Sequence, residues 1–210
     1  MNQVFDFFLD AYKNTSITLI VFEAIAFVFG ILSVIYAKKE NILVYPTGLV
    51  ATVITVYLLY KAEYFGDMMM NFYYSVMSIY GWWNWSRKKE DRYIVPISRT
   101  NSQEKTIGIV LFFITMFVTY LVYSVYDYEL KIPNYIDIVT SGIFFTAMWY
   151  MATKKLENWT LWIIADIVTV PLYAYRGLGM LSLQYLIFTI LAIQGYKQWK
   201  KSIDNNLQTV

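Results

Sequence analysis

Histidine and cysteine are both missing from this 210-residue chain. Their absence excludes disulfides, thiolate chemistry, histidine-based metal sites and the Ser-His and Cys-His pairs of nucleophilic catalysis. The sequence also contains no Walker A motif and no other catalytic residue set, so we expect no ATP hydrolysis by this chain. We therefore predict a protein that is not an enzyme and has no cofactor. No run of basic residues resembles a nucleic-acid footprint, so nucleic acid is not an expected partner.

Charge is scarce as well, and it lies in short clusters between long apolar runs. Only 15% of the residues are charged, whereas 58% are hydrophobic and 20% are aromatic. This composition is typical of a protein that crosses a bilayer several times. At about 20 residues per crossing, seven runs are long enough to span: about 17–37, 42–60, 68–85, 107–126, 133–152, 160–175 and 180–199. Polar residues dilute the third and sixth spans at matching places, which points to a binding site.

The basic residues predict an orientation in the membrane. If the N-terminus is outside, 13 of the 17 Lys and Arg residues fall in inner segments and four in outer segments. The positive-inside rule then places the C-terminus in the cytoplasm. Asp6 and Asp10 lie where a cleavable signal would be positive. They argue against a cleavable signal. An apolar face made by Val4, Phe5, Phe8, Leu9 and Tyr12 instead predicts that residues 1–16 form a short helix in the membrane interface.

Two sets of markers indicate an internal duplication. The stretches 38–41 and 81–85 (KKEN and GWWNW) are matched by 154–158 and 195–199 (KKLEN and GYKQW), and each pair encloses two apolar runs. The fourth span is a single inverter, so both copies insert in the same direction, as a parallel repeat with the substrate site between them. We predict an all-α membrane protein in a 3+1+3 arrangement. Its units are 17–85, a cytoplasmic loop plus linker helix at 86–132, 133–199, and a cytoplasmic tail at 200–210.

Three acidic residues lie within spans, and no basic residue lies deep within a span to pair with them, since Lys197 is at the very end of the seventh. An intramembrane acid costs roughly 2.5–3.5 kcal/mol on insertion scales, so each one needs a reason. Glu23 and Asp137 occupy similar places in the two copies. They are either structural, tying helices together, or gating residues at a cation-attracting mouth or a proton site.

Asp166 ends a stripe of aromatic residues along the sixth span. Trp159, Trp162 and Asp166 share one helical face, which Tyr173 extends and Asn158 precedes. Indoles and a carboxylate on one face are able to hold a flat cationic ring. Polar residues on neighbouring spans favour a shared cavity over simple interhelical glue. On the third span these are Asn71, Tyr74 and Ser78, with Trp82 one turn further, and on the seventh span they are Gln184 and Gln194.

The marked stretches resemble the PnuC family of vitamin transporters. The resemblance rests on NFYY and YGWWNW in the third span, on ENWTLWIIAD in the sixth, on the seventh span, and on Glu23 and Asp137. It implies a fold like that of the SWEET sugar transporters and a homotrimer in the bacterial inner membrane. It further implies facilitated diffusion of an unphosphorylated vitamin precursor that a cytoplasmic kinase then traps.

The resemblance gives nicotinamide riboside as the first expected substrate and thiamine as a close second. Both are cations, so the charge of Asp166 favours them over neutral riboflavin. Two alternatives are a sugar-type carrier of the SWEET architecture and a proton-coupled vitamin symporter. A neutral sugar has no use for a buried carboxylate, which argues against the first alternative.

Overall fold

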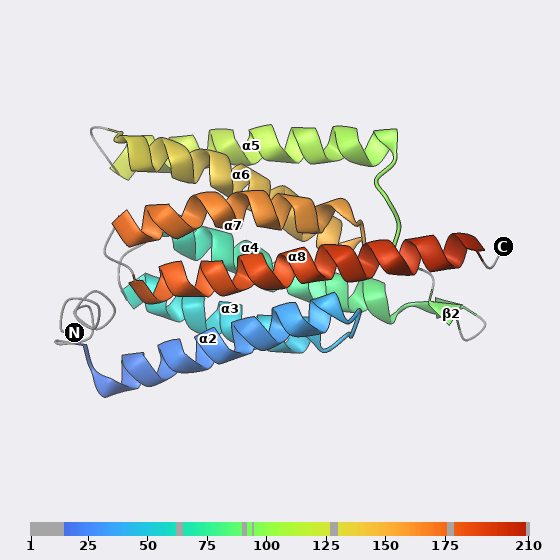
Figure 1. Cartoon of the computed structure of the whole chain (residues 1–210). Coiled ribbons are helices and arrows are strands. Elements are labelled where there is room, and N and C mark those ends of the chain that lie inside the picture. The colour runs from blue at the N-terminus through green and yellow to red at the C-terminus, as the bar shows by residue number, and fades with distance from the viewer. Residues whose placement is uncertain are drawn as a thin grey trace.

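Seven long helices lie side by side in the computed structural model, which describes residues 15–61, 65–89, 92–93, 95–126, 130–175 and 179–208 (Figure 1). The helices are α2 (Ile17–Lys38), α3 (Val44–Lys61), α4 (Phe65–Ser86), α5 (Ser102–Tyr126), α6 (Ile132–Ala152), α7 (Glu157–Tyr175) and α8 (Gly179–Gln208). Two short antiparallel strands, β1 (Lys88–Lys89) and β2 (Arg92–Tyr93), follow α4. The all-α prediction is confirmed. The interfacial helix predicted for residues 1–16 falls almost entirely outside the described residues.

The helices run alternately in opposite directions, so their connections gather at two ends of the molecule. Here the basic end means the connections 39–43, 87–101 and 153–156 together with the last turns of α8. Helices α2, α4, α6 and α8 end there, and α2 begins at the opposite end (Figure 1). Each of the seven predicted spans lies within, or within two residues of, one of these helices.

Helix α5 begins earlier than its apolar run because a capping box starts it. The Asn101 side chain accepts a hydrogen bond from the Glu104 backbone N–H at 2.8 Å, and the Glu104 carboxylate accepts one from the Asn101 backbone N–H at 2.9 Å. Such reciprocal bonds satisfy amide donors that a helix start otherwise leaves open. The first turn of α5 is therefore polar and precedes the predicted span.

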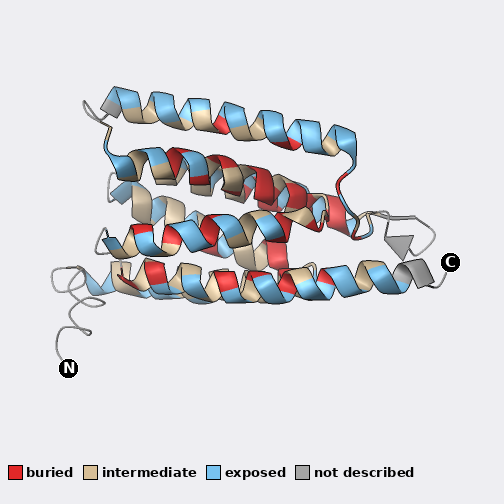
Figure 2. Cartoon of the chain, turned by 45° about the horizontal axis from the view of Figure 1, so that its top comes forward, coloured by how far each residue is buried: buried red, intermediate tan, exposed pale blue. Residues whose placement is uncertain are grey.

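Four of the helices, α2, α3, α5 and α8, are long and apolar enough to be spans by composition alone. Helices α4, α6 and α7 are as long but more polar, because they direct polar side chains inward. Asp137, Thr140 and Thr146 are buried on α6, and Asp166 and Thr169 on α7. Buried residues are concentrated on these inner helices, whereas α5 is mostly exposed (Figure 2).

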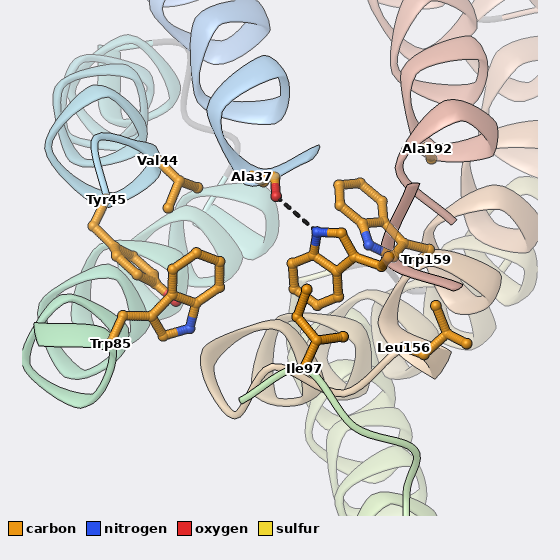
Figure 3. Close-up of a cluster of buried hydrophobic side chains, with 9 residues drawn as sticks. Ala37, Val44, Tyr45, Trp85, Ile97, Leu156, Trp159 and Ala192 are labelled. Carbon is orange, nitrogen blue, oxygen red and sulfur yellow. Dashed lines mark hydrogen bonds between the residues drawn. The ribbon is translucent and has the colours of Figure 1, made fainter. Parts of the chain in front are cut away.

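The largest buried cluster lies at the basic end (Figure 3). It contains the aromatic residues Tyr45, Trp85, Trp159 and Trp199, each no more than 2% exposed. Aliphatic residues fill the space around the rings: Ala37, Val44, Ile97, Leu156 and Ala192. This cluster joins α2, α3 and α4 to α7 and α8, so the basic end of the molecule is closed by packed side chains.

Candidate binding pocket around Asp166

Asp166 is the most deeply buried acid in the described part of the chain. It is 1% exposed on α7, and its Oδ1 atom has no hydrogen-bond partner among the described residues. Burying a carboxylate without a partner is costly, and natural proteins normally avoid it. An unsatisfied acceptor in a transmembrane helix therefore marks a place where a ligand group can bind.

Aromatic rings from four helices surround this position. The Trp162 ring, one turn before Asp166, lies 6.1 Å from the Tyr74 ring of α4 and 5.4 Å from the Phe144 ring of α6. The Phe144 ring in turn lies 5.9 Å from the Tyr185 ring of α8. These rings and the buried carboxyl group make up the candidate binding site, which we call the Asp166 pocket.

Tyr173 lies about two turns beyond Asp166 on α7 and extends the aromatic wall. Its ring stacks on Tyr185 with centroids 5.3 Å apart and planes 23° from parallel. Phe144 and Tyr185 were not among the residues expected from the sequence to bind substrate. An aromatic residue in an apolar helix looks the same in sequence whether it faces lipid or a pocket, so no signal marked either one.

The other residues of the polar face predicted for α4 lie away from this pocket. Ser78 is buried one turn from Tyr74, and its Oγ lies 3.7 Å from where a side chain on Gly48 would begin. Asn71 donates from Nδ2 to the Asp67 carbonyl at 2.9 Å. Trp82 is 42% exposed and lies outside the pocket.

The remaining expected residues lie near the basic end or on another interface. Asn158 and Trp159 are fully buried there, and Trp159 contacts Trp199. Gln194 is exposed and accepts a hydrogen bond from Lys38 Nζ at 2.8 Å. Gln184 Nε2 lies 3.1 Å from where a side chain on Gly30 would begin, at the contact of α2 with α8. The structure thus brings Tyr74, Trp162, Asp166 and Tyr173 together, whereas the residues named in this paragraph lie elsewhere.

The two other intramembrane acids are separate from the pocket. Asp137 is 8% exposed, and its Oδ2 accepts a hydrogen bond from the Tyr123 hydroxyl at 2.8 Å. This bond joins α5 to α6. Glu23 is half-buried on α2. No group of three or more potential metal ligands occurs among the residues that the structure describes.

Comparisons with known proteins agree with this architecture. A family model described as nicotinamide mononucleotide transporter matches residues 20–201. Nicotinamide riboside transporters PnuC from Escherichia coli (strain K12) and Shigella flexneri are each 24% identical over 203 residues, which cover 86% of this chain and 85% of the relative. The PnuC of Neisseria mucosa is 25% identical over 190 residues, covering 86% of this chain and 72% of the relative.

A solved structure has the same fold. The crystal structure of the vitamin B3 transporter PnuC superimposes with a TM-score of 0.70 at 22% identity, covering 94% of this chain and 86% of that one.

Proposed function

The chain belongs to the nicotinamide mononucleotide transporter family, and we propose that it carries nicotinamide riboside across a bacterial inner membrane by facilitated diffusion. It is a multi-pass membrane transporter and not an enzyme. The observation that carries the choice of substrate is the buried carboxylate of Asp166, which has an open acceptor and aromatic walls. A flat pyridinium ring carries a positive charge for the carboxylate and a face for the indole of Trp162.

The pocket favours the riboside over the phosphorylated mononucleotide. A phosphate would bring negative charge into a buried site, and it would need cationic or N–H partners there. Phosphate sites are built from Arg, Lys or backbone N–H groups at helix starts. No Lys or Arg occurs in the sequence between positions 157 and 175, the extent of α7 that carries Asp166.

Thiamine and sugars fit the observations less well. Thiamine is also a cation, but the curated relatives are named for nicotinamide riboside. A sugar is neutral and would leave the Asp166 carboxylate uncompensated when it entered the pocket. The alternative to facilitated diffusion is a proton-coupled mechanism, because a buried carboxylate is also able to carry a proton.

The 3+1+3 arrangement is supported by the order of helix contacts. Helices α2, α3, α4, α6, α7 and α8 form a closed ring in which each contacts the next and α8 returns to α2. Exchanging α2–α4 with α6–α8 leaves this ring unchanged, since the α2–α8 contact becomes the α6–α4 contact. Helix α5 packs on the outside, against α6. A parallel repeat with one inverter helix is the topology that produces this pattern.

A constant spacing supports the same repeat. Glu40 and Lys154, which pair with each other, are 114 positions apart, and both have left-handed backbone conformations, with φ of 55° and 54°. The same spacing relates the acids Glu23 and Asp137. It also relates Gly81 to Gly195. We propose that 17–85 and 133–199 are the two units, related by an axis along the membrane normal.

The orientation and the partners complete the proposal. Most Lys and Arg residues lie at the basic end, so we propose that this end faces the cytoplasm and that the N-terminus is outside. Diffusion down a gradient cannot accumulate substrate, so uptake needs a cytoplasmic kinase that phosphorylates the riboside and removes it. We further propose a homotrimer with one pathway in each copy, as the family resemblance implies.

Uptake into liposomes tests the proposed function. Purified protein is reconstituted and mixed with labelled nicotinamide riboside, thiamine or riboflavin, without ATP and without an ion gradient. We expect the riboside to equilibrate fastest and to stop at equal concentrations on both sides. Accumulation that collapses with a proton ionophore would replace facilitated diffusion by proton coupling. A faster rate for thiamine would replace the substrate.

A further inference from the structure

Two tryptophans make matching hydrogen bonds between the halves at the basic end. Trp85 on α4 donates from Nε1 to the Met151 carbonyl at the end of α6, at 3.2 Å. Trp199 on α8 donates from Nε1 to the Ala37 carbonyl at the end of α2, at 3.1 Å, the bond drawn as a dashed line in Figure 3. The donors, and likewise the acceptors, are separated by the spacing of 114 residues that relates Glu40 to Lys154. Each half therefore holds the other by the same bond.

The rings around these bonds are matched in the same way. Trp85 meets Tyr45 edge to face with centroids 5.1 Å apart, and Trp199 meets Trp159 edge to face at 5.4 Å. Both pairs have interplanar angles of 87°. The two indoles then contact each other across the halves, with centroids 5.9 Å apart. These four rings fill the centre of the basic end.

An ion pair lies over the rings. Lys154 Nζ is 2.7 Å from Glu40 Oε1 and 4.6 Å from the centroid of the Trp85 ring. The Lys154 side chain is 3% exposed. Glu40 belongs to the α2–α3 connection and Lys154 to the α6–α7 connection, so the pair also joins the two halves. A cavity of about 200 Å³ opens beside it, lined by Lys39, Glu40, Ile42, Trp85 and Lys154.

We infer that Trp85, Trp199 and the Glu40–Lys154 pair form the inner gate of the transport pathway. The inference rests on the proposed function, since a carrier must open this end to release its cargo. Asp166 is buried on α7 about two turns beyond Trp159, so the four packed rings lie between it and the solvent at the basic end. The contacts between the halves are hydrogen bonds and ring contacts, and we expect them to break and re-form together.

One side of the gate is anchored, so the other side is the one that moves. Ser98 pairs with the α6–α7 connection through backbone bonds to Lys154 and Leu156, at 3.1 and 2.8 Å. The side chain of Lys155 adds a hydrogen bond to Ser98 Oγ at 2.9 Å. Within the described residues no segment pairs its backbone with the α2–α3 connection in this way. We expect residues 39–43 to move away from a fixed α6–α7 connection.

Cross-linking tests the gate directly, because the chain has no cysteine of its own. In the double variant Glu40→Cys and Lys154→Cys, a short bifunctional thiol reagent bridges the two connections. We expect the bridged protein in liposomes to lose uptake of labelled nicotinamide riboside almost completely. The matched control is the double variant Ser98→Cys and Lys155→Cys, whose bridge stays within the anchored side and leaves uptake unchanged. Full uptake by protein shown by mass spectrometry to be bridged at 40 and 154 would overturn the gate.

A second readout does not depend on transport. A cysteine placed at Asp166 reports whether a membrane-impermeant maleimide applied at the basic end reaches the pocket. We expect Trp85→Phe and Trp199→Phe each to raise the labelling rate about fivefold, the factor for one lost hydrogen bond. Trp83→Phe is the control, since Trp83 is 57% exposed and outside the cluster. If all three variants label alike, the tryptophans are scaffold. If uptake is absent in unbridged protein while labelling changes as expected, the proposed substrate fails and the gate stands.

Discussion

At the scale of single residues, the pocket depends on one negative charge. Asp166→Asn keeps the shape of the side chain and removes the charge. A buried, charge-assisted contact contributes more than a neutral one. We therefore expect the binding free energy for nicotinamide riboside to become less favourable by about 1–3 kcal/mol. A binding titration with purified protein measures this change.

The control for this substitution is Asp137→Asn. Asp137 is also buried, but its carboxylate already accepts a hydrogen bond from Tyr123, and it lies outside the pocket. We expect Asp137→Asn to leave the Kd unchanged. If Asp166→Asn also binds with unaltered affinity while it folds normally, Asp166 has a structural role only.

The indole of Trp162 gives the second prediction at this scale. Its ring faces Tyr74 and Phe144 at 6.1 and 5.4 Å, which leaves it in position to stack on a flat cation. Trp162→Ala should weaken riboside binding by about 1–2 kcal/mol, the range of a partly desolvated cation–π contact. Trp83→Ala removes an exposed indole from α4 and serves as the comparison. Equal affinities in the two variants would remove the stacking contact from the binding site.

At the scale of helices, two glycines set how closely neighbours approach. A Cβ on Gly195 would lie 2.7 Å from the Trp159 ring, and a Cβ on Gly81 would lie 2.3 Å from the Tyr45 ring. Both rings are at the start of a helix and are buried in the cluster at the basic end. Gly195→Ala therefore forces α8 away from α7, and overpacking of this kind costs about 1–3 kcal/mol.

Thermal unfolding in detergent measures this cost, with Gly30→Ala as the control. A Cβ on Gly30 would lie 3.1 Å from Gln184 Nε2, the far end of a flexible side chain, and 3.5 Å from Phe188 Cζ, an ordinary contact distance. We expect Gly195→Ala to lower the unfolding temperature and Gly30→Ala to leave it nearly unchanged. Equal unfolding temperatures would mean that α7 and α8 have room to separate.

The helices also show how far the sequence alone reaches. The apolar runs predicted all seven helices, because a span needs a minimum length, although α5 begins five residues earlier than its run and α8 ends nine residues later. Trp82 shows the limit. A straight helix puts it on the face of Asn71 and Ser78, but the buried positions of α4 follow Ser78, Gly81 and Trp85, a shorter period. The buried face of α4 therefore passes to one side of Trp82, which is 42% exposed.

The pocket was only partly predictable for a related reason. Asp166 was identifiable because an acid in an apolar run has few explanations. Trp159 lies on the same helical face as Asp166, yet at the basic end that face meets α8 instead of the pocket. Phe144 and Tyr185 carry no such mark in the sequence. Which face of a helix meets which neighbour is a property of the assembled bundle.

At the scale of the whole molecule, the proposed function requires that α4, α6 and α7 cross the membrane together with the four more apolar helices. Hydropathy alone marks four spans, because polar residues lower the scores of α4, α6 and α7. A transporter with a polar pathway has this profile, since its inner helices face one another and not lipid. In the proposed parallel repeat all seven helices cross the membrane, with α5 as the inverter outside the ring of six.

Single cysteines in the cysteine-free chain distinguish seven crossings from four. Lys39, Arg99, Lys131 and Lys200 are all exposed and lie in or beside connections between helices. With seven crossings, Lys39→Cys, Arg99→Cys and Lys200→Cys share the cytoplasmic side, and Lys131→Cys lies on the opposite side. With only α2, α3, α5 and α8 crossing, position 99 moves to the side opposite to position 39. We expect a membrane-impermeant maleimide added to intact cells to label position 131 alone. Labelling of position 99 under those conditions would contradict the parallel repeat, on which the proposed pocket and gate depend.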